Sequence, residues 1–224
     1  EGTIWGAREE FISSPHLDDM QCAFATLKGF LKGYHEKSVN VYACFDNEEV
    51  GSVTKQGAGS TFLYDVLRRI NSGFGKTEED YYRAVSESFM VSADNAHAVH
   101  PNHPQKTDVE NCVYMNEGIV IKSHAGQKYT SDAVSIAIFK NICKQAGVPV
   151  QFFANRSDEA GGSTLGNISS AQVSLNAVDI GLPQLAMHSA YETAGIKDTE
   201  YMVQAMKTFF ESHICMENGQ IIWS

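Results

Sequence analysis

Short apolar stretches alternate with longer amphipathic ones along this chain, and this alternation restricts its fold more than any other feature of the sequence. The short stretches are rich in Val, Ile and Phe and predict strands at residues 38–45, 88–94, 118–122, 148–154 and 177–183. The longer stretches repeat apolar residues three and four positions apart and predict helices at residues 20–31, 61–70, 131–146, 163–175 and 199–210. This pattern favours a three-layer α/β/α fold with a largely parallel or mixed central sheet. Ligands of such sheets bind beyond the carboxyl ends of the strands.

The composition limits the number of domains and the kind of partner. With 224 residues, of which 43% are hydrophobic, the chain can bury one sizeable core, so we expect a single domain spanning residues 1–224. A formal net charge of −10 argues against nucleic acid or an anionic membrane as a partner, because phosphates require a basic surface. No apolar run approaches the length of a bilayer span, and the five cysteines lack CxxC spacing. We therefore expect a soluble, cytoplasmic protein that binds small molecules, peptides or metal ions.

Three carboxylates are crowded into the four residues that follow the first predicted strand. They belong to Asp46, Glu48 and Glu49, with Asn47 between them. A solvated acidic turn, or acids at the positively polarised start of the next helix, would be the ordinary explanation. Three acids beside a hydrophobic strand nevertheless repel one another unless they are protonated or share a cation. A divalent metal ion is the simplest way to relieve this repulsion.

Further oxygen and imidazole donors occur next to other predicted elements, as a metal site would require. Asp18 and Asp19 precede the first helix, where acidic residues are also common N-caps. Asp94 ends the second strand and is followed by three histidines at three-residue spacing, His97, His100 and His103. His188 follows the last strand, although a lone histidine is more often a buried, hydrogen-bonded residue. Each signal is weak alone, and together they favour a metal centre.

Several motifs of the chain resemble, in their order and approximate spacing, those of the aspartyl aminopeptidase family of dizinc exopeptidases. They are SPHLDD, FDNEEVGS, SADNAHAVHPN, KYTSDAVS, RSDEAGGSTLGNISS and PQLAMHS, and they extend over nearly the whole chain. The resemblance implies a zinc-exopeptidase-like fold, a peptide substrate that loses its N-terminal residue, two divalent metal ions as cofactors, and a homo-oligomer, commonly a dodecamer. It extends only to the C-terminal catalytic part of the family's proteins.

The resemblance also implies roles for individual residues. Asp18 is similar to the family's aspartate that bridges the two metal ions. Glu49, Asp94 and His188 resemble further metal ligands, and Glu48 resembles the general base that holds the attacking water. The residues that resemble the lining of the family's substrate pocket are His97, Lys122 and Tyr129, together with the loop 156–166.

Physical chemistry agrees with these implied roles. Zinc accepts carboxylate oxygen and imidazole nitrogen, and a shared carboxylate lets two such ions lie about 3.5–4 Å apart. Neighbouring residues of a turn point in different directions, so Glu49 can bind metal while Glu48 addresses the water. Lys122 would favour an acidic first side chain, Asp or Glu, although without the resemblance a solvated strand end would be the simpler interpretation. We expect zinc, with manganese or cobalt as alternatives that suit the same donors.

Two departures from the family pattern leave a second hypothesis open. The family has a further histidine ligand in an upstream His-x-Asp motif and a smaller dimerisation domain, and we expect both to be absent from this chain. His16, Leu17 and Asp18 imitate that motif in letters, but they match the bridging-aspartate segment, so His16 is not assigned as a ligand. The chain is therefore either a catalytic segment of a metallo-aminopeptidase or a non-catalytic fragment that acts as a metal-binding or structural module.

The peptidase hypothesis requires four residues that are distant in the sequence to lie close together in space. They are Asp18, Glu49, Asp94 and His188. Three of these, Asp18, Glu49 and His188, could supply the protein ligands of one ion, so we expect this chain to bind a single metal ion by itself.

Overall fold

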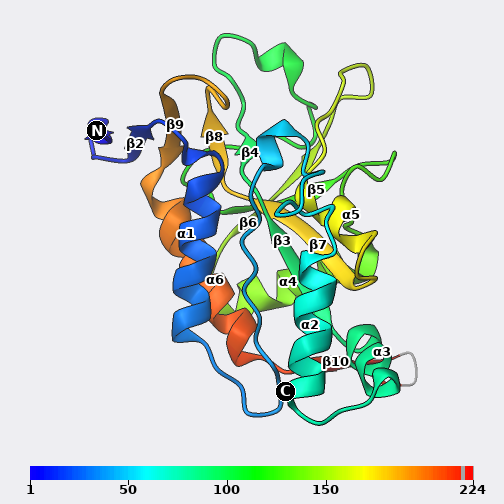
Figure 1. The fold of residues 1–224 in the computed structure, drawn as a ribbon. Coiled ribbons are helices and arrows are strands. Elements are labelled where there is room, and N and C mark those ends of the chain that lie inside the picture. The colour runs from blue at the N-terminus through cyan, green and yellow to red at the C-terminus, as the bar shows by residue number, and fades with distance from the viewer. Residues whose placement is uncertain (218–219, 224) are drawn as a thin grey trace.

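In the computed structural model, which describes residues 1–217 and 220–223, helices pack against two mixed sheets, and a third sheet of two antiparallel strands follows the last helix (Figure 1). The helices of these residues are α1 (Leu17–Lys32), α2 (Phe62–Gly73), α3 (Glu78–Ser86), α4 (Ala133–Ala146), α5 (Leu165–Ser170) and α6 (Ile196–Glu211), with the 3-10 turns η1 (Glu48–Val50) and η2 (Pro104–Lys106). The strands are β1 (Thr3–Trp5), β2 (Phe11–Ser14), β3 (Phe89–Ala93), β4 (Ala96–His97), β5 (Ile119–Ser123), β6 (Val150–Ala154), β7 (Asn176–Gly181), β8 (Pro183–Leu185), β9 (Glu192–Gly195), β10 (Ile214–Glu217) and β11 (Gln220–Trp223). Across the described part of the chain, every helix is too short or too polar to span a bilayer.

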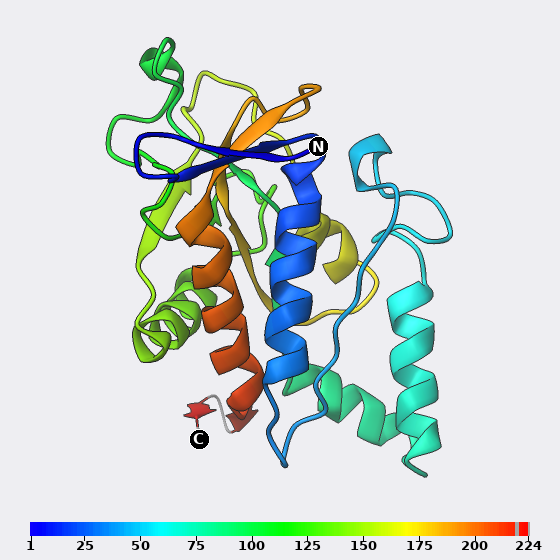
Figure 2. The ribbon, with the colours of Figure 1, turned by 90° about the vertical axis from the view of Figure 1, so that its left-hand side faces the viewer.

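A four-stranded sheet with the order β3-β7-β5-β6 lies at the centre of the hydrophobic core. β3 is parallel to β7 and β5 is parallel to β6, whereas β5 and β7 are antiparallel. Val178 and Ile180 of β7 join the core cluster with residues of α1, α4 and α6, and α1 and α6 lie side by side (Figures 1 and 2). Asp179 points to the opposite face, where it accepts a 2.8 Å hydrogen bond from the Thr164 hydroxyl beside α5. Successive strand residues point to opposite faces, so Asp179 faces away from the cluster that Val178 and Ile180 join. α1, α4, α5 and α6 all contact this sheet, and helices therefore lie on both of its faces.

The second sheet brings two turns of the chain to one end of the molecule. Its strand order is β1-β2-β9-β8-β4, and its pairs are antiparallel apart from β4 with β8. β2 leads directly into α1, and residues 186–191 connect β8 to β9. Since β2 pairs with β9, the start of α1 and the β8–β9 turn lie close together, near the η1 turn at the top of Figure 2.

Most of the expected elements are confirmed. The strands predicted at 88–94, 118–122, 148–154 and 177–183 correspond to β3, β5, β6 and β7. The helices predicted at 20–31, 61–70, 131–146 and 199–210 correspond to α1, α2, α4 and α6. The helix predicted at 163–175 is shortened to α5, because the backbone turns after Ser170 to begin β7 at Asn176. The α/β class is confirmed, whereas the strands of the described residues form three sheets, of four, five and two strands, instead of the one expected.

The strand predicted at residues 38–45 is wrong. This segment runs alongside α1 (Figure 2) and pairs with no strand among the described residues. Side chains attach it to the helices instead: Tyr42 Oη donates to the Ala23 carbonyl at 3.0 Å, and Asn40 Nδ2 donates to the Phe210 carbonyl at 2.8 Å. An apolar, β-branched stretch becomes a strand only when a neighbouring strand completes its backbone hydrogen bonds, and sequence composition does not reveal that neighbour.

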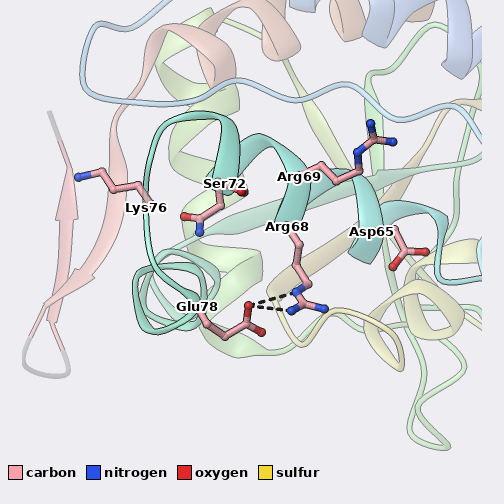
Figure 3. A pocket seen from close by; sticks show the side chains of 7 residues that line it. Asp65, Arg68, Arg69, Ser72, Lys76 and Glu78 are labelled. Atoms are coloured by element: carbon pink, nitrogen blue, oxygen red, sulfur yellow. Dashed lines mark hydrogen bonds and ion pairs between the residues drawn. The ribbon is translucent and has the colours of Figure 1, made fainter.

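The sequence patterns also do not predict α3, which packs beside α2. α3 begins with a capping box, in which Asp80 N donates to Thr77 Oγ1 at 3.2 Å and Thr77 N donates to Asp80 Oδ2 at 2.8 Å. A pocket lies between the two helices, where Arg68 donates to Glu78 at 2.8 Å (Figure 3). None of the residues predicted to bind metal or substrate lines this pocket.

Candidate metal centre

Carboxylates and an imidazole from four segments of the chain meet at the end of the molecule where α1 begins. The residues are Asp18 and Asp19 at the start of α1, Glu48 and Glu49 in η1, Asp94 after β3, and His188 between β8 and β9. Asn47 and His188 have the left-handed backbone conformation, with φ of 60° and 65°. Residues other than glycine seldom adopt this conformation, and those that do are concentrated in turns and functional sites.

Two groups of donor atoms share Asp18. In the first, His188 Nε2 lies 3.1 Å from Asp18 Oδ2 and 2.9 Å from Glu49 Oε2. In the second, carboxylate oxygens of Asp18, Asp19 and Asp94 lie within 4.8 Å of one another. The structure therefore brings together all four predicted ligands, with Asp18 between the two groups. Their role as metal ligands stays a prediction.

The protein environment opposes negative charge at this centre. Burial, and then the neighbouring carboxylates of Asp94 and Glu49, raise the pKa of Asp18 to about 9. The same causes, burial first, raise the pKa of Glu48 to about 7. A negative charge on Asp18 or Glu48 is thus costly in the protein alone, which is the situation that a nearby cation relieves.

The residues present fit a divalent cation. The Asp18 side chain is only 4% exposed, and its Oδ1 atom accepts no hydrogen bond from the described residues. A buried carboxylate oxygen without a donor is uncommon, because it loses its contact with water and gains nothing in return. Carboxylate oxygens and an imidazole nitrogen are ligands that zinc accepts. His188 is 65% exposed at its side chain, so the first group is open to solvent.

Lys122 is part of this centre and is not a solvated strand end. It is 2% exposed on β5, and its ammonium lies 3.4 Å from Asp94 Oδ2 and donates to the Asn95 carbonyl at 2.8 Å. Burial lowers the pKa of Lys122, but its neighbouring groups, Asp94 foremost, together raise it more, so the pKa lies above its ordinary value. The Tyr129 ring, 7% exposed, lies 5.6 Å from the ammonium.

The three histidines after Asp94 do not lie together in one site. His97 lies on β4, whereas His100 and His103 occupy the exposed loop before η2, with ring centroids 5.2 Å apart. In the described part of the chain, neither His100 nor His103 is among the donors that could hold a metal ion. His97 is also outside these groups, and its predicted contact with substrate stays a prediction.

Two residues behind the centre are missed by sequence reasoning. Asn95, 2% exposed, donates from its backbone to Asp19 Oδ1 at 3.0 Å and from its side chain to Gln184 Oε1 at 2.8 Å. Glu192, also 2% exposed, accepts hydrogen bonds from two backbone N–H groups of the centre, those of Asp18 and His188. Asn95 lies in the motif SADNAHAVHPN, but sequence reasoning gives it no role, and Glu192 lies outside the quoted motifs. Their burial and hydrogen bonds identify both residues.

Fold and centre together define an α/β protein with a carboxylate and imidazole site suited to divalent cations. Residues 1–210 match the family described as Aminopeptidase I zinc metalloprotease (M18). The chain belongs to this family of metallo-aminopeptidases, which confirms the resemblance found in the motifs.

Known proteins of the family are similar to this chain over part of their length. The probable M18 family aminopeptidase 2 of Clostridium acetobutylicum is 50% identical over 210 residues, which cover 94% of this chain and 48% of that protein. Aspartyl aminopeptidase 1 of Schizosaccharomyces pombe is 39% identical over 225 residues, covering 98% and 47%. The solved structure of the S. cerevisiae mApe1 dodecamer matches with a TM-score of 0.80 at 29% identity, covering 94% of this chain and 48% of that chain. The chain thus spans about half the length of the curated relatives it matches.

Proposed function

We propose that this chain carries catalytic residues of a metallo-aminopeptidase that removes N-terminal acidic residues, Asp or Glu, from peptides. The convergence of Asp18, Glu49, Asp94 and His188 is the observation that carries this proposal. These residues come from four separate segments, and a structural role would not require their donor atoms to meet.

Asp18 is the proposed bridge between two divalent cations. Glu49 and His188 would complete the protein ligands of one cation, and Asp94 would hold the other. When bound, the cations supply Lewis-acid chemistry that makes water a nucleophile near neutral pH and polarises the peptide carbonyl. The hydrogen-bond-free Oδ1 of Asp18 supports this assignment. Zinc agrees with the family description, and manganese or cobalt would suit the same donors.

Glu48 is the proposed general base. It would accept the proton of the attacking water and later donate it to the leaving amine. Glu48 is half-buried and lies next to Glu49 in η1, so the same turn carries a metal ligand and the base. Removing a positioned general base typically lowers the rate by roughly 10²- to 10⁴-fold.

His97, Lys122 and Tyr129 are the proposed contacts of the peptide's first residue. The buried ammonium of Lys122 supports a preference for an acidic side chain, because such a side chain would share this charge with Asp94. The name of the S. pombe relative, aspartyl aminopeptidase, supports the same preference.

The proposal is tested by hydrolysis of aspartyl, glutamyl and leucyl reporter substrates, using this chain alone and the longest polypeptide that contains it. We expect hydrolysis of the acidic reporters, loss of activity on chelation, recovery with zinc, and a drop of roughly 10²-fold or more for Glu48→Gln. Glu79→Gln, on the exposed face of α3, is the matched control and should retain full activity. Full activity in Glu48→Gln would exclude Glu48 as the base, and a preference for the leucyl reporter would exclude the acidic specificity.

A non-catalytic metal-binding or structural module is the second candidate function. It is favoured by the fraction of the relatives' length that the chain spans, about half. Such a module would bind one cation or none and would hydrolyse no reporter, whereas a complete peptidase site would bind two.

Several finer features belong to the same proposal. We infer a single catalytic unit in residues 1–224, a three-layer α/β/α arrangement, a cytoplasmic location and a homo-oligomer. The mApe1 structure, described as a dodecamer, supports assembly of this kind. Light scattering coupled to gel filtration would measure the assembly state, and a monomer at all concentrations would contradict it for this chain.

A further inference from the structure

Glu192 lies behind the metal centre, where it contacts the backbone of two predicted ligands. Its Oε2 accepts a hydrogen bond from Asp18 N at 2.9 Å, and its Oε1 accepts one from His188 N at 2.7 Å. Asp18 lies at the start of α1 and His188 in the β8–β9 turn, so one carboxylate joins two segments that are distant in the sequence. Glu192 is 2% exposed and is therefore shielded from water.

We propose that Glu192 is a positioning residue, whose two carboxylate oxygens hold the backbones of Asp18 and His188 so that both side chains reach the same cation. This inference rests on the proposed function, because it assumes that Asp18 and His188 bind metal. Carboxylates that orient metal ligands without touching the metal are common, but they usually bind the ligand's imidazole or carboxylate, whereas Glu192 binds two backbone N–H groups.

The surrounding backbone explains why such a residue is needed. His188 has φ of 65°, a conformation that a non-glycine residue keeps only when neighbouring contacts hold it there. A hydrogen bond from its N–H to a carboxylate is charge-assisted and therefore stronger than one to a neutral acceptor. Glu192 is itself fixed, because it begins β9 and lies opposite Ser14 in the pairing of β9 with β2.

Glu192 does not belong to the ligand groups themselves. Each of its oxygens is directed to a backbone N–H, and within the described residues the groups that could hold a metal ion do not include it. It therefore acts through Asp18 and His188, and its removal should weaken metal binding without changing the number of bound ions.

Asp198 provides a matched control for this role. It is fully buried and also accepts two backbone hydrogen bonds, from Asn116 N at 2.6 Å and from Gly118 N at 3.0 Å. Neither of these two partners belongs to the metal centre. Glu192→Gln and Asp198→Asn thus make the same chemical change, replacement of one carboxylate oxygen by an NH2 group, which donates hydrogen bonds and cannot accept one.

The experiment measures binding of Zn²⁺ and Co²⁺ to the whole chain by calorimetry, with the visible absorption of bound Co²⁺ as a record of ligand geometry. We expect Glu192→Gln to weaken binding by roughly 10- to 100-fold and to change the Co²⁺ spectrum, and Glu192→Asp to do so partly. Asp198→Asn should bind metal as the wild type does. Circular dichroism confirms that each variant is folded.

The outcomes separate this inference from the proposed function. A wild-type chain that binds neither ion contradicts the proposed metal centre, and the inference with it. Wild-type binding together with unchanged affinity and spectrum in Glu192→Gln contradicts the inference alone. Equal weakening in Asp198→Asn, or unfolding of both Glu192 variants while Asp198→Asn folds, would assign Glu192 a purely structural role and also overturn it.

Discussion

Replacing Lys122 by methionine tests whether its ammonium neutralises Asp94 inside the protein. Methionine keeps an unbranched chain of similar length, so Lys122→Met removes the charge and the hydrogen bond to the Asn95 carbonyl while preserving most of the packing. The side chains of Lys122 and Asp94 are only 3% and 13% exposed, so the remaining carboxylate cannot regain full hydration.

The structure sets the size of the expected effect. Removing one partner of a buried ion pair typically costs ~3–5 kcal/mol, because the other charge stays buried and unpaired. For a chain of this size each kcal/mol corresponds to about 2–4 °C in Tm, so Tm should fall by roughly 6–20 °C in the metal-free protein. Urea unfolding in the presence of a chelator measures the loss of free energy directly.

Lys207→Met is the matched control, because it removes an ion pair of equal length. Lys207 Nζ also lies 3.4 Å from its partner, Glu211 Oε1, but these two side chains are 47% and 43% exposed. Exposed pairs of this kind contribute about 0.3–0.5 kcal/mol. Equal losses of unfolding free energy in the two variants would refute the argument from burial.

Added zinc should reduce the loss of unfolding free energy caused by Lys122→Met, because a cation would then neutralise Asp94. An unchanged loss would argue that Asp94 binds no metal.

Two further predictions concern stability away from the centre. Gly29→Ala should destabilise the protein by ~1–3 kcal/mol, because the new Cβ would lie 2.4 Å from Met206 Cβ and 2.9 Å from Lys207 N where α1 meets α6. Gly73→Ala in α2, where the new Cβ would meet no packed neighbour within 4 Å, should instead stabilise the protein by ~0.5–1 kcal/mol. Urea unfolding measures both variants, and a lower free energy of unfolding in both would contradict the packing argument. Burial raises the pKa of Asp198 from 3.8 to about 7, against its two backbone hydrogen bonds, so the folded state retains this proton and stability should fall as pH rises from about 4 to about 7. Asp198→Asn should lack this fall, and parallel pH profiles of unfolding free energy for the two proteins would contradict the shift.

Periodicity in the sequence predicts the elements whose apolar faces build the core. α1, α4 and α6 contribute Cys22, Phe139 and Met202 to one cluster, and each of these residues is fully buried. Local spacing of side chains is sufficient in such cases, because a helix completes its backbone hydrogen bonds within itself. The strand predicted at 38–45 is wrong for the opposite reason, since a strand depends on a partner strand that can come from any part of a chain.

The residues of the metal centre likewise fall into those that the sequence predicts and those whose position depends on contacts between distant segments. The resemblance of several motifs to the aspartyl aminopeptidase family predicts Asp18, Glu49, Asp94 and His188 as a group, although the strand expected before Glu49 does not form. Glu192 is not predicted, because its role depends on the β2–β9 pairing that aligns it with the start of α1. The burial of Lys122 is likewise a consequence of how β5 packs, and a lone lysine after an apolar run does not indicate it.

The number of zinc ions bound per chain tests the central claim most directly. Elemental analysis after dialysis against dilute zinc should find at least one ion per chain in the wild type and a clear loss in Asp18→Asn, which removes the carboxylate shared by both donor groups. A wild-type chain without bound zinc, or an Asp18→Asn variant that retains the full amount, would contradict the account.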